Sequence, residues 1–228
     1  MKINLSILLI TLLFSNCIIQ NSYAEEIMSF VISFVYKHNS EEICPIDFSK
    51  TEHKLQSGTE YKIFFKPIIK NTYIYIIKSV GFDKKYLFLY PYPDYYDYCN
   101  ILNNDYYLPD QKDWYIFNDN KILEEFTLIV SNKKLRELEN KIETYLIHEN
   151  IDSGENKKAK KELEAELRDL RLKNSKFVRK PEEAVIISGG NKGSNDEIKK
   201  LAKVIKIDIS NKVEDLYVYS KTIKLFKK

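Results

Sequence analysis

Several common functional signatures are missing from this chain of 228 residues. After residue 24 it has no apolar segment as long as a transmembrane helix. Its three histidines and three cysteines do not have the spacing of a closed zinc site, and its acidic clusters do not follow a calcium loop. Residues 188–194 lack the Gly-Lys-Ser/Thr ending of a phosphate-binding loop. We therefore expect no later membrane span, no metal site and no cofactor.

The clearest feature that is present is an N-terminal export signal. Lys2 precedes an apolar run over residues 3–14, and the small-residue ending at 22–24 predicts cleavage after Ala24. A retained membrane helix is the alternative, but the run is shorter than the roughly 20 apolar residues that cross a bilayer. We expect an exported protein that is periplasmic or extracellular.

A lipoprotein anchored through Cys17 is a further alternative. A lipidation signal normally has an aliphatic residue three positions before the cysteine and a small residue directly before it. This chain has Phe14 and Asn16 at those positions, so we favour the cleaved form without a lipid.

Cleavage after residue 24 would leave two cysteines, Cys44 and Cys99. In an oxidising compartment, such a pair with no competing thiol predicts a disulfide. That bond would constrain the unfolded chain and stabilise the fold by about 4 kcal/mol. Two separate buried thiols are the alternative.

Charge is distributed unevenly along the chain. Residues 25–132 carry 11 Lys and 16 acidic residues, a net charge of −5, whereas residues 133–228 carry 24 Lys or Arg and 17 acidic residues, a net charge of +7. The change marks a boundary near residue 132 and would suit an anionic partner for the C-terminal part. We favour the alternative of a solvated helical surface, because acids and bases are interspersed there.

Residues 27–130 have the patterns of β-strands. The segment 28–36 is rich in β-branched and aromatic residues and predicts a strand buried on much of both faces. Residues 59–65 alternate, and residues 72–77 form the next apolar run. The short connection over 66–71 predicts that these two strands form a hairpin.

A further strand over 85–90 ends at Pro91, because proline cannot donate to a sheet ladder. Residues 91–113 are dense in Tyr, Asp, Asn and Pro and predict an ordered surface loop, with a short extended piece at 106–108. Another core strand is expected at 125–130. Several short strands separated by turn signals favour a sandwich or a small barrel.

Between residues 57 and 131, short elements occur in a recognisable order. They are Phe65-Lys66-Pro67, Tyr73-Ile74-Tyr75, Leu89-Tyr90-Pro91, Asn100, Leu108-Pro109, Trp114 and Glu125-Phe126. Their order and spacing resemble the bacterial domain of unknown function 4384 family. One departure is Lys121-Ile122-Leu123, where the family often has a Gly before the Glu, so the last turn is expected to differ.

The resemblance implies an exported or envelope-associated module, of a kind often appended to other domains such as caspase-like peptidases. No catalytic residues are established for that module. The resemblance therefore favours a binding or assembly role over an enzyme, and it supplies no site residues.

Beyond residue 132 the apolar period becomes that of helices. Two segments with apolar residues every three or four positions flank the polar stretch 150–156, which predicts an antiparallel helical hairpin within residues 133–180. Each apolar stripe must pack on a neighbour, and we expect packing within the chain, with self-association through a coiled coil as the alternative. The stripes are Leu135, Leu138, Ile142 and Tyr145, and Ala159, Leu163, Leu167 and Leu170.

Residues 181–195 predict a flexible linker. A short helix capped by Asn195 or Asp196 is expected to follow. Residues 196–228 are then expected to complete the domain that residues 25–132 begin. Strand-like alternation returns twice in this last part, over 203–209 and 215–226.

Catalytic interpretations are weaker. Cys44 and His53 supply a thiol and a base, but no third orienting group is evident. Cys44, Cys99, His38 and His53 have the atom types of a zinc site without its spacing, and His148 is most simply a surface histidine. The alternative function is therefore a thiol- or metal-dependent hydrolase, or an accessory domain of an envelope hydrolase or peptidase system.

Aromatic residues are concentrated between residues 90 and 114. Tyrosine combines a flat apolar face with a hydrogen-bonding tip, which suits a sugar polymer or a protein partner. Packing of these rings onto the sheet is the alternative. Acidic residues in the same stretch disfavour an anionic ligand there and would admit a cation. The candidate contact residues are Tyr92, Tyr95, Tyr96, Tyr98 and Trp114, and the acidic ones are Asp94, Asp97, Asp105 and Asp110.

These patterns together predict an α+β fold with an antiparallel β-sandwich-like core, a C-terminal helical hairpin and returning strands. The expected function is non-catalytic binding or assembly in the bacterial cell envelope, with an envelope protein or a glycan as partner. Export and the acidic N-terminal part disfavour nucleic acid.

Overall fold

The computed structural model describes residues 27–39, 42–69, 72–92, 104–110, 112–118, 123–149, 154–174, 183–184, 194–208 and 216–228. Several predictions concern residues outside these ranges. They are the signal peptide with Cys17, the loop residues Asp94 to Cys99, the departure from the family pattern at 121–122, and most of the linker over 181–195.

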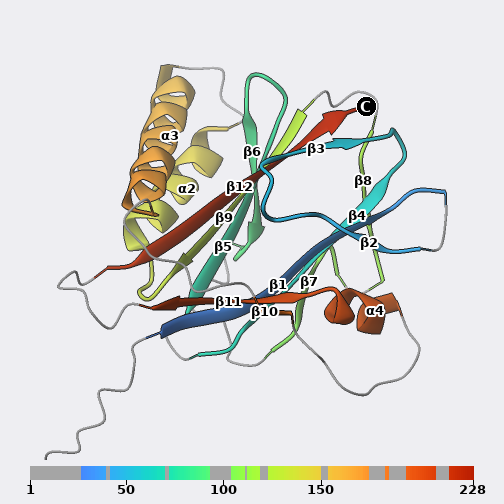
Figure 1. Cartoon of the computed structure of the whole chain (residues 1–228). Coiled ribbons are helices and arrows are strands. Elements are labelled where there is room, and N and C mark those ends of the chain that lie inside the picture. Colours follow the sequence, from blue (N-terminus) through green and yellow to red (C-terminus); the bar gives the residue numbers. More distant parts are fainter. Residues whose placement is uncertain are drawn as a thin grey trace, which may run out of the picture.

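Two β-sheets face each other and enclose the main core (Figure 1). The larger is a seven-stranded sheet with the order β10 (Glu183–Ala184), β11 (Lys203–Asp208), β1 (Ile27–Lys37), β4 (Glu60–Pro67), β7 (Tyr106–Leu108), in which β2 (Cys44–Pro45) also pairs with β1 and β8 (Tyr115–Ile116) with β4. The smaller is a five-stranded sheet with the order β3 (Glu52–Leu55), β12 (Val218–Lys227), β9 (Leu123–Ser131), β5 (Tyr73–Val80), β6 (Lys85–Tyr90). Pairing is antiparallel throughout the described strands except between β3 and β12. The predicted sandwich-like core is confirmed.

β1 is buried on both of its faces, as its composition predicts. Phe30, Ile32 and Phe34 point into the core between the sheets, where they contact residues of the five-stranded sheet. Val31 and Val35 point to the other face and pack beneath α4 (Ser194–Lys200). A strand covered on both sides needs apolar residues at successive positions, which explains the continuous run.

The predicted hairpin between residues 59–65 and 72–77 is wrong. The two strands exist, but β4 pairs with β1, β7 and β8, whereas β5 pairs with β6 and β9 in the other sheet. The connection carries the chain from one sheet to the other. Most residues of both strands are buried, so each strand needs cover on two faces, and the short connection does not reveal which strands will lie beside it.

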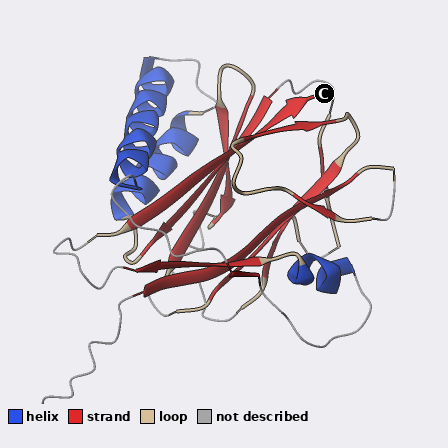
Figure 2. Ribbon diagram, viewed as in Figure 1, coloured by secondary structure: helices blue, strands red, loops and turns tan. Residues whose placement is uncertain are grey.

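Two helices cover the outer face of the five-stranded sheet (Figure 2). α2 (Arg136–His148) and α3 (Gly154–Asn174) form the predicted hairpin. The predicted apolar stripes pack against one another and against residues such as Tyr75, Ile77 and Ile129 of the sheet. The hairpin therefore packs within the chain, and a coiled coil has no support in the described residues.

The C-terminal strands enter both sheets. β11 pairs with β1 at one side of the seven-stranded sheet, and β12 lies between β3 and β9 in the five-stranded sheet. Two details differ from expectation. β10 pairs with β11 inside the predicted linker, and α4 begins at Ser194, so Asn195 and Asp196 lie in its first turn rather than at its cap. None of the helices in the described part of the chain has the length and hydrophobicity that crossing a membrane requires.

Candidate functional site

Of the predicted aromatic contact residues that the structure describes, Tyr92 is the exposed one, with 58% of its surface accessible. It follows β6 and the cis Tyr90–Pro91 bond. The pKa of Tyr115 is raised to about 12, chiefly because Tyr115 is buried and in smaller part because the Tyr92 hydroxyl lies nearby. Tyr115 in turn packs against Tyr61 in the core, with ring centroids 5.4 Å apart. Tyr92 is therefore an exposed ring whose hydroxyl lies within electrostatic reach of a fixed aromatic cluster.

Trp114 lies on the other face of the seven-stranded sheet, away from the core. Its ring packs in the cluster beneath α4, and it has the Lys37 ammonium 4.6 Å and the Lys62 ammonium 5.2 Å from its centroid. Cation–π contacts of this kind fix a ring in place. Tyr92 and Trp114 thus do not share a surface, and Tyr95, Tyr96 and Tyr98 lie outside the described residues.

Other aromatic residues of the same stretch pack against buried rings of the seven-stranded sheet. Tyr106 stacks on Phe65 with an interplanar angle of 7° and centroids 5.1 Å apart. Tyr90 contacts the same Phe65 ring at 4.6 Å. Tyr107 packs on Phe64 on the opposite face. These three tyrosines therefore pack onto the sheet, which is the alternative to partner contact that the sequence left open.

Asp105 and Asp110, the two acidic residues of the predicted site that the structure describes, both contact lysines, Asp110 through its backbone. Asp105 forms ion pairs with Lys66 at 3.5 Å and with Lys199 at 2.6 Å. The backbone carbonyl of Asp110 accepts a hydrogen bond from Lys62 at 3.3 Å. Within the described ranges, no group of three or more His, Cys, Asp or Glu residues could hold a metal ion.

The candidate thiol and histidines are dispersed. Cys44 is a half-buried free thiol in β2, so the predicted disulfide with Cys99 is not supported, and Cys99 itself lies outside the described residues. His53 lies in β3 of the other sheet, where burial lowers its pKa. His38 hydrogen-bonds Thr59 through Nδ1 at 3.2 Å and Asn39 through Nε2 at 3.1 Å. The geometry assembles neither a Cys–His pair nor a zinc site from these residues.

A buried ionic cluster joins the two sheets. The Lys78 ammonium lies 3.0 Å from Glu124 Oε2 and donates a hydrogen bond of 2.6 Å to the Tyr61 hydroxyl, which donates to the same Glu124 oxygen at 2.6 Å. Glu124 and Tyr61 are fully buried. Burial and the neighbouring Glu124 raise the pKa of Tyr61 far above its ordinary value. These contacts give each of the three groups a polar partner, and both of those made by Glu124 use Oε2.

A cleft opens on the outer face of the five-stranded sheet, between α3 and the turn that joins β5 to β6. Its volume is about 460 Å³, which lies within the usual range for small-ligand sites. We call it the α3 cleft. Its lining is Phe82, Asp83, Lys84, Tyr86, Lys160, Glu164, Leu167, Arg168 and Arg171.

Hydrogen bonds hold the walls of the α3 cleft together. Lys160 donates to the backbone carbonyl of Asp83, which ties α3 to the turn. Arg171 donates to Glu125 at 3.0 Å and to Thr127 at 2.8 Å, both in β9. The Tyr86 hydroxyl donates to Glu164 at 3.3 Å. Burial and the neighbouring Glu164 carboxylate raise the pKa of Tyr86. The cleft is a built feature of the sheet and the helix.

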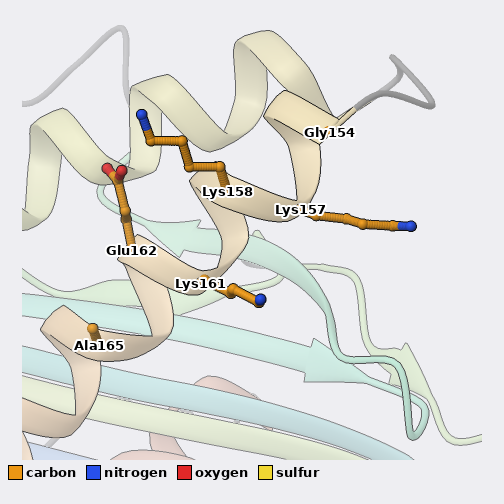
Figure 3. Close-up of a pocket in the computed structure, with 6 residues that line it drawn as sticks. All are labelled: Gly154, Lys157, Lys158, Lys161, Glu162 and Ala165. Atoms are coloured by element: carbon orange, nitrogen blue, oxygen red, sulfur yellow. The ribbon is translucent and has the colours of Figure 1, made fainter.

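A more exposed part of the α3 surface gives a useful contrast. A shallow depression of about 400 Å³ is lined there by Gly154, Lys157, Lys158, Lys161, Glu162 and Ala165. Figure 3 shows that its lysine side chains extend in different directions instead of converging. Glu162 forms an ion pair with Lys141 of α2 at 2.9 Å. This face is a solvated helix surface.

Sequence reasoning missed the α3 cleft, because its cations come from segments about 80 residues apart and only the fold brings them together. The nearest signal is the excess of basic residues after residue 132. Comparisons with protein-family models, curated proteins and solved structures found no match for this chain.

Proposed function

We propose that this chain is an exported, non-catalytic binding or assembly module of the bacterial cell envelope, and that the surface at Tyr92 contacts its partner. The observation that carries the proposal is the exposure of the Tyr92 ring, 58% of its surface, beside the fixed Tyr115. The partner class is an envelope protein or a glycan.

The chemistry of the site supports this role. A tyrosine ring offers a large contact area at a small cost in conformational entropy, and its hydroxyl adds a directional hydrogen bond. Tyr92 also stands directly before the sequence segment with Tyr95, Tyr96 and Tyr98. A rigid β-sandwich is a suitable scaffold for recognition, because binding residues are commonly presented on loops held by a rigid core.

Site-specific photocrosslinking in the native envelope tests this proposal. A photoreactive phenylalanine at position 92 is expected to give a defined adduct, which Tyr95→Ala with Tyr96→Ala abolishes without changing the thermal unfolding of the protein. Position 147 is the matched control, because Ile147 is 69% exposed on α2. An adduct of the same kind from both positions, or none from position 92, would contradict the proposed surface.

The export part of the proposal has its own test. Intact-mass measurement of protein recovered from the native envelope is expected to give a chain that begins at Glu25. A chain that begins with a lipid-modified Cys17 would instead indicate a membrane-anchored lipoprotein. A full-length N-terminus in the cytosol would rule out export.

A further inference from the structure

The α3 cleft contains positive charge that the described part of the chain leaves uncompensated. Lys84 and Arg168 line the cleft, and neither side chain has an ion pair or a hydrogen bond to any other residue within the described structure. In total, four cationic side chains and two carboxylates form the lining. Positive charge is therefore in excess.

The other two cations are engaged but retain donors. Lys160 uses one of the three N–H groups of its ammonium on the Asp83 carbonyl. Arg171 binds Glu125 and Thr127 through a single Nη2 atom, so the rest of its guanidinium is not occupied by these bonds. Their hydrogen bonds fix both cations at the wall, which lowers the entropy lost when a ligand binds.

The spacing of the cations indicates an extended ligand. Lys160 and Arg171 are separated by 11 positions on one side of α3, which corresponds to about 16 Å along a helix axis. An extended peptide of about five residues covers the same length. A single phosphate or carboxylate group would contact only a part of this row.

An exposed aromatic ring stands in the same lining. Phe82, in the turn between β5 and β6, has 76% of its surface accessible, which makes it the most exposed of the large hydrophobic residues in the described structure. An exposed apolar ring beside a row of cations suits a ligand that has an apolar side chain between its anionic groups. Peptides combine these two features more readily than acidic sugars do.

From these observations we infer that the α3 cleft binds an extended acidic peptide segment. Its carboxylates contact Lys84, Arg168 and the free donors of Lys160, and an apolar side chain packs on Phe82. The site lies on the outer face of the five-stranded sheet, whereas Tyr115 lies between the two sheets. The inference therefore does not depend on the surface proposed at Tyr92.

Titration calorimetry with a synthetic probe tests the inference, at an ionic strength of about 0.15 M, where the Debye length is about 8 Å. The probe is an N-acetylated, C-amidated pentapeptide with two glutamates on each side of one phenylalanine. We expect it to bind, and we expect Lys84→Glu with Arg168→Glu to weaken binding about tenfold, because two attractive charges become repulsive. Phe82→Ala is expected to weaken it about threefold. Neither substitution breaks an ion pair that the structure shows.

The outer face of α3 supplies the matched control. Lys157→Glu with Lys161→Glu makes the same change in net charge on the side shown in Figure 3, and it is expected to leave the affinity within about twofold. Equal losses in the two double variants would mean that only net charge attracts the peptide, which would overturn the site. The absence of binding, equal binding of the probe with glutamine in place of glutamate, or tighter binding of an oligogalacturonate would overturn the acidic-peptide assignment. Unaltered crosslinking from position 92 in the Lys84/Arg168 variant would separate this result from the Tyr92 surface.

Discussion

At the scale of single residues, the core contains two charged side chains, Lys78 and Glu124, at positions where hydrophobic side chains are usual. Lys78 and Glu124 are almost completely buried, and Tyr61 bridges them. A buried pair adds little net stability compared with apolar residues of similar size, because the attraction must offset the desolvation of both ions. Removal of one partner is different, since it leaves the other charge buried.

We predict that Lys78→Met or Glu124→Leu alone lowers the free energy of unfolding by about 3–5 kcal/mol. The double variant should recover most of that loss. Urea denaturation followed by circular dichroism measures both effects. Lys85→Met is the control, because its ammonium pairs with Glu149 at 2.9 Å but is 64% exposed, and little change is expected. Additive losses in the double variant would mean that the two charges do not act as a pair.

His53 gives the fold a predictable dependence on pH. Burial lowers the pKa of His53 below its ordinary value of 6.5, although Lys50 and Asp47 partly oppose this shift. In the pH range between the lowered value and 6.5, the unfolded chain binds a proton more readily than the folded chain. The contribution of His53 to stability therefore decreases as the pH falls through this range.

The corresponding experiment compares the protein with His53→Gln. We expect acidification from about pH 7.5 to about pH 5 to destabilise the wild-type protein more than the variant, because only the wild type has this titrating group. Chemical denaturation at the two pH values measures the difference. The same pH dependence in both proteins would assign the effect to other groups.

At the scale of secondary-structure elements, a tyrosine of β5 caps the start of helix α2. The Tyr75 hydroxyl accepts a hydrogen bond from the Leu135 amide at 2.9 Å and donates one to Glu139 at 2.9 Å. No side chain at the N-cap position of α2 makes a capping hydrogen bond. A tyrosine from the sheet thus satisfies a donor that the helix would otherwise leave open.

We predict that Tyr75→Phe lowers the free energy of unfolding by about 1–3 kcal/mol, since both bonds are lost in a buried environment. Amide hydrogen exchange should show faster opening at the start of α2. Tyr73→Phe is the matched control, because Tyr73 is only partly buried and packs at the side of the same cluster. Equal destabilisation by the two substitutions would contradict the capping role.

The elements themselves were largely predictable, because strand and helix periodicity is local. The strand over residues 28–36 and the stripes from Leu135 and Ala159 needed only neighbours along the chain. The pairing of β4 and β5 was not predictable, since it depends on which distant strand reaches each edge. β8 and β10 have only two residues and no period to detect. The separation of Tyr92 from Trp114 was not predictable either, because it depends on which face of the seven-stranded sheet each ring lies near.

At the scale of the whole molecule, a strand distant in sequence from its partners lies in the middle of a sheet. β12 lies between β9 and β3, and its residues Ile223 and Leu225 are buried. It contacts elements formed more than 80 residues earlier. The five-stranded sheet can therefore be completed only when β12 is available, and loss of β12 would leave β3 without the strand that pairs with it in the described structure.

We predict that a chain stopped after residue 215 loses cooperative thermal unfolding and binds a hydrophobic dye, because a central strand and the five buried hydrophobic side chains from Tyr217 to Leu225 are absent. A synthetic peptide of residues 216–228 is expected to restore the transition, since the vacant position offers two strand edges with unsatisfied backbone groups. The same peptide with Ile223→Asp and Leu225→Asp is the control and should not restore it, because charges at these positions would be buried. Cooperative unfolding of the truncated chain by itself would show that β12 is dispensable, and rescue by both peptides would show that backbone pairing alone, without core packing, places the last strand.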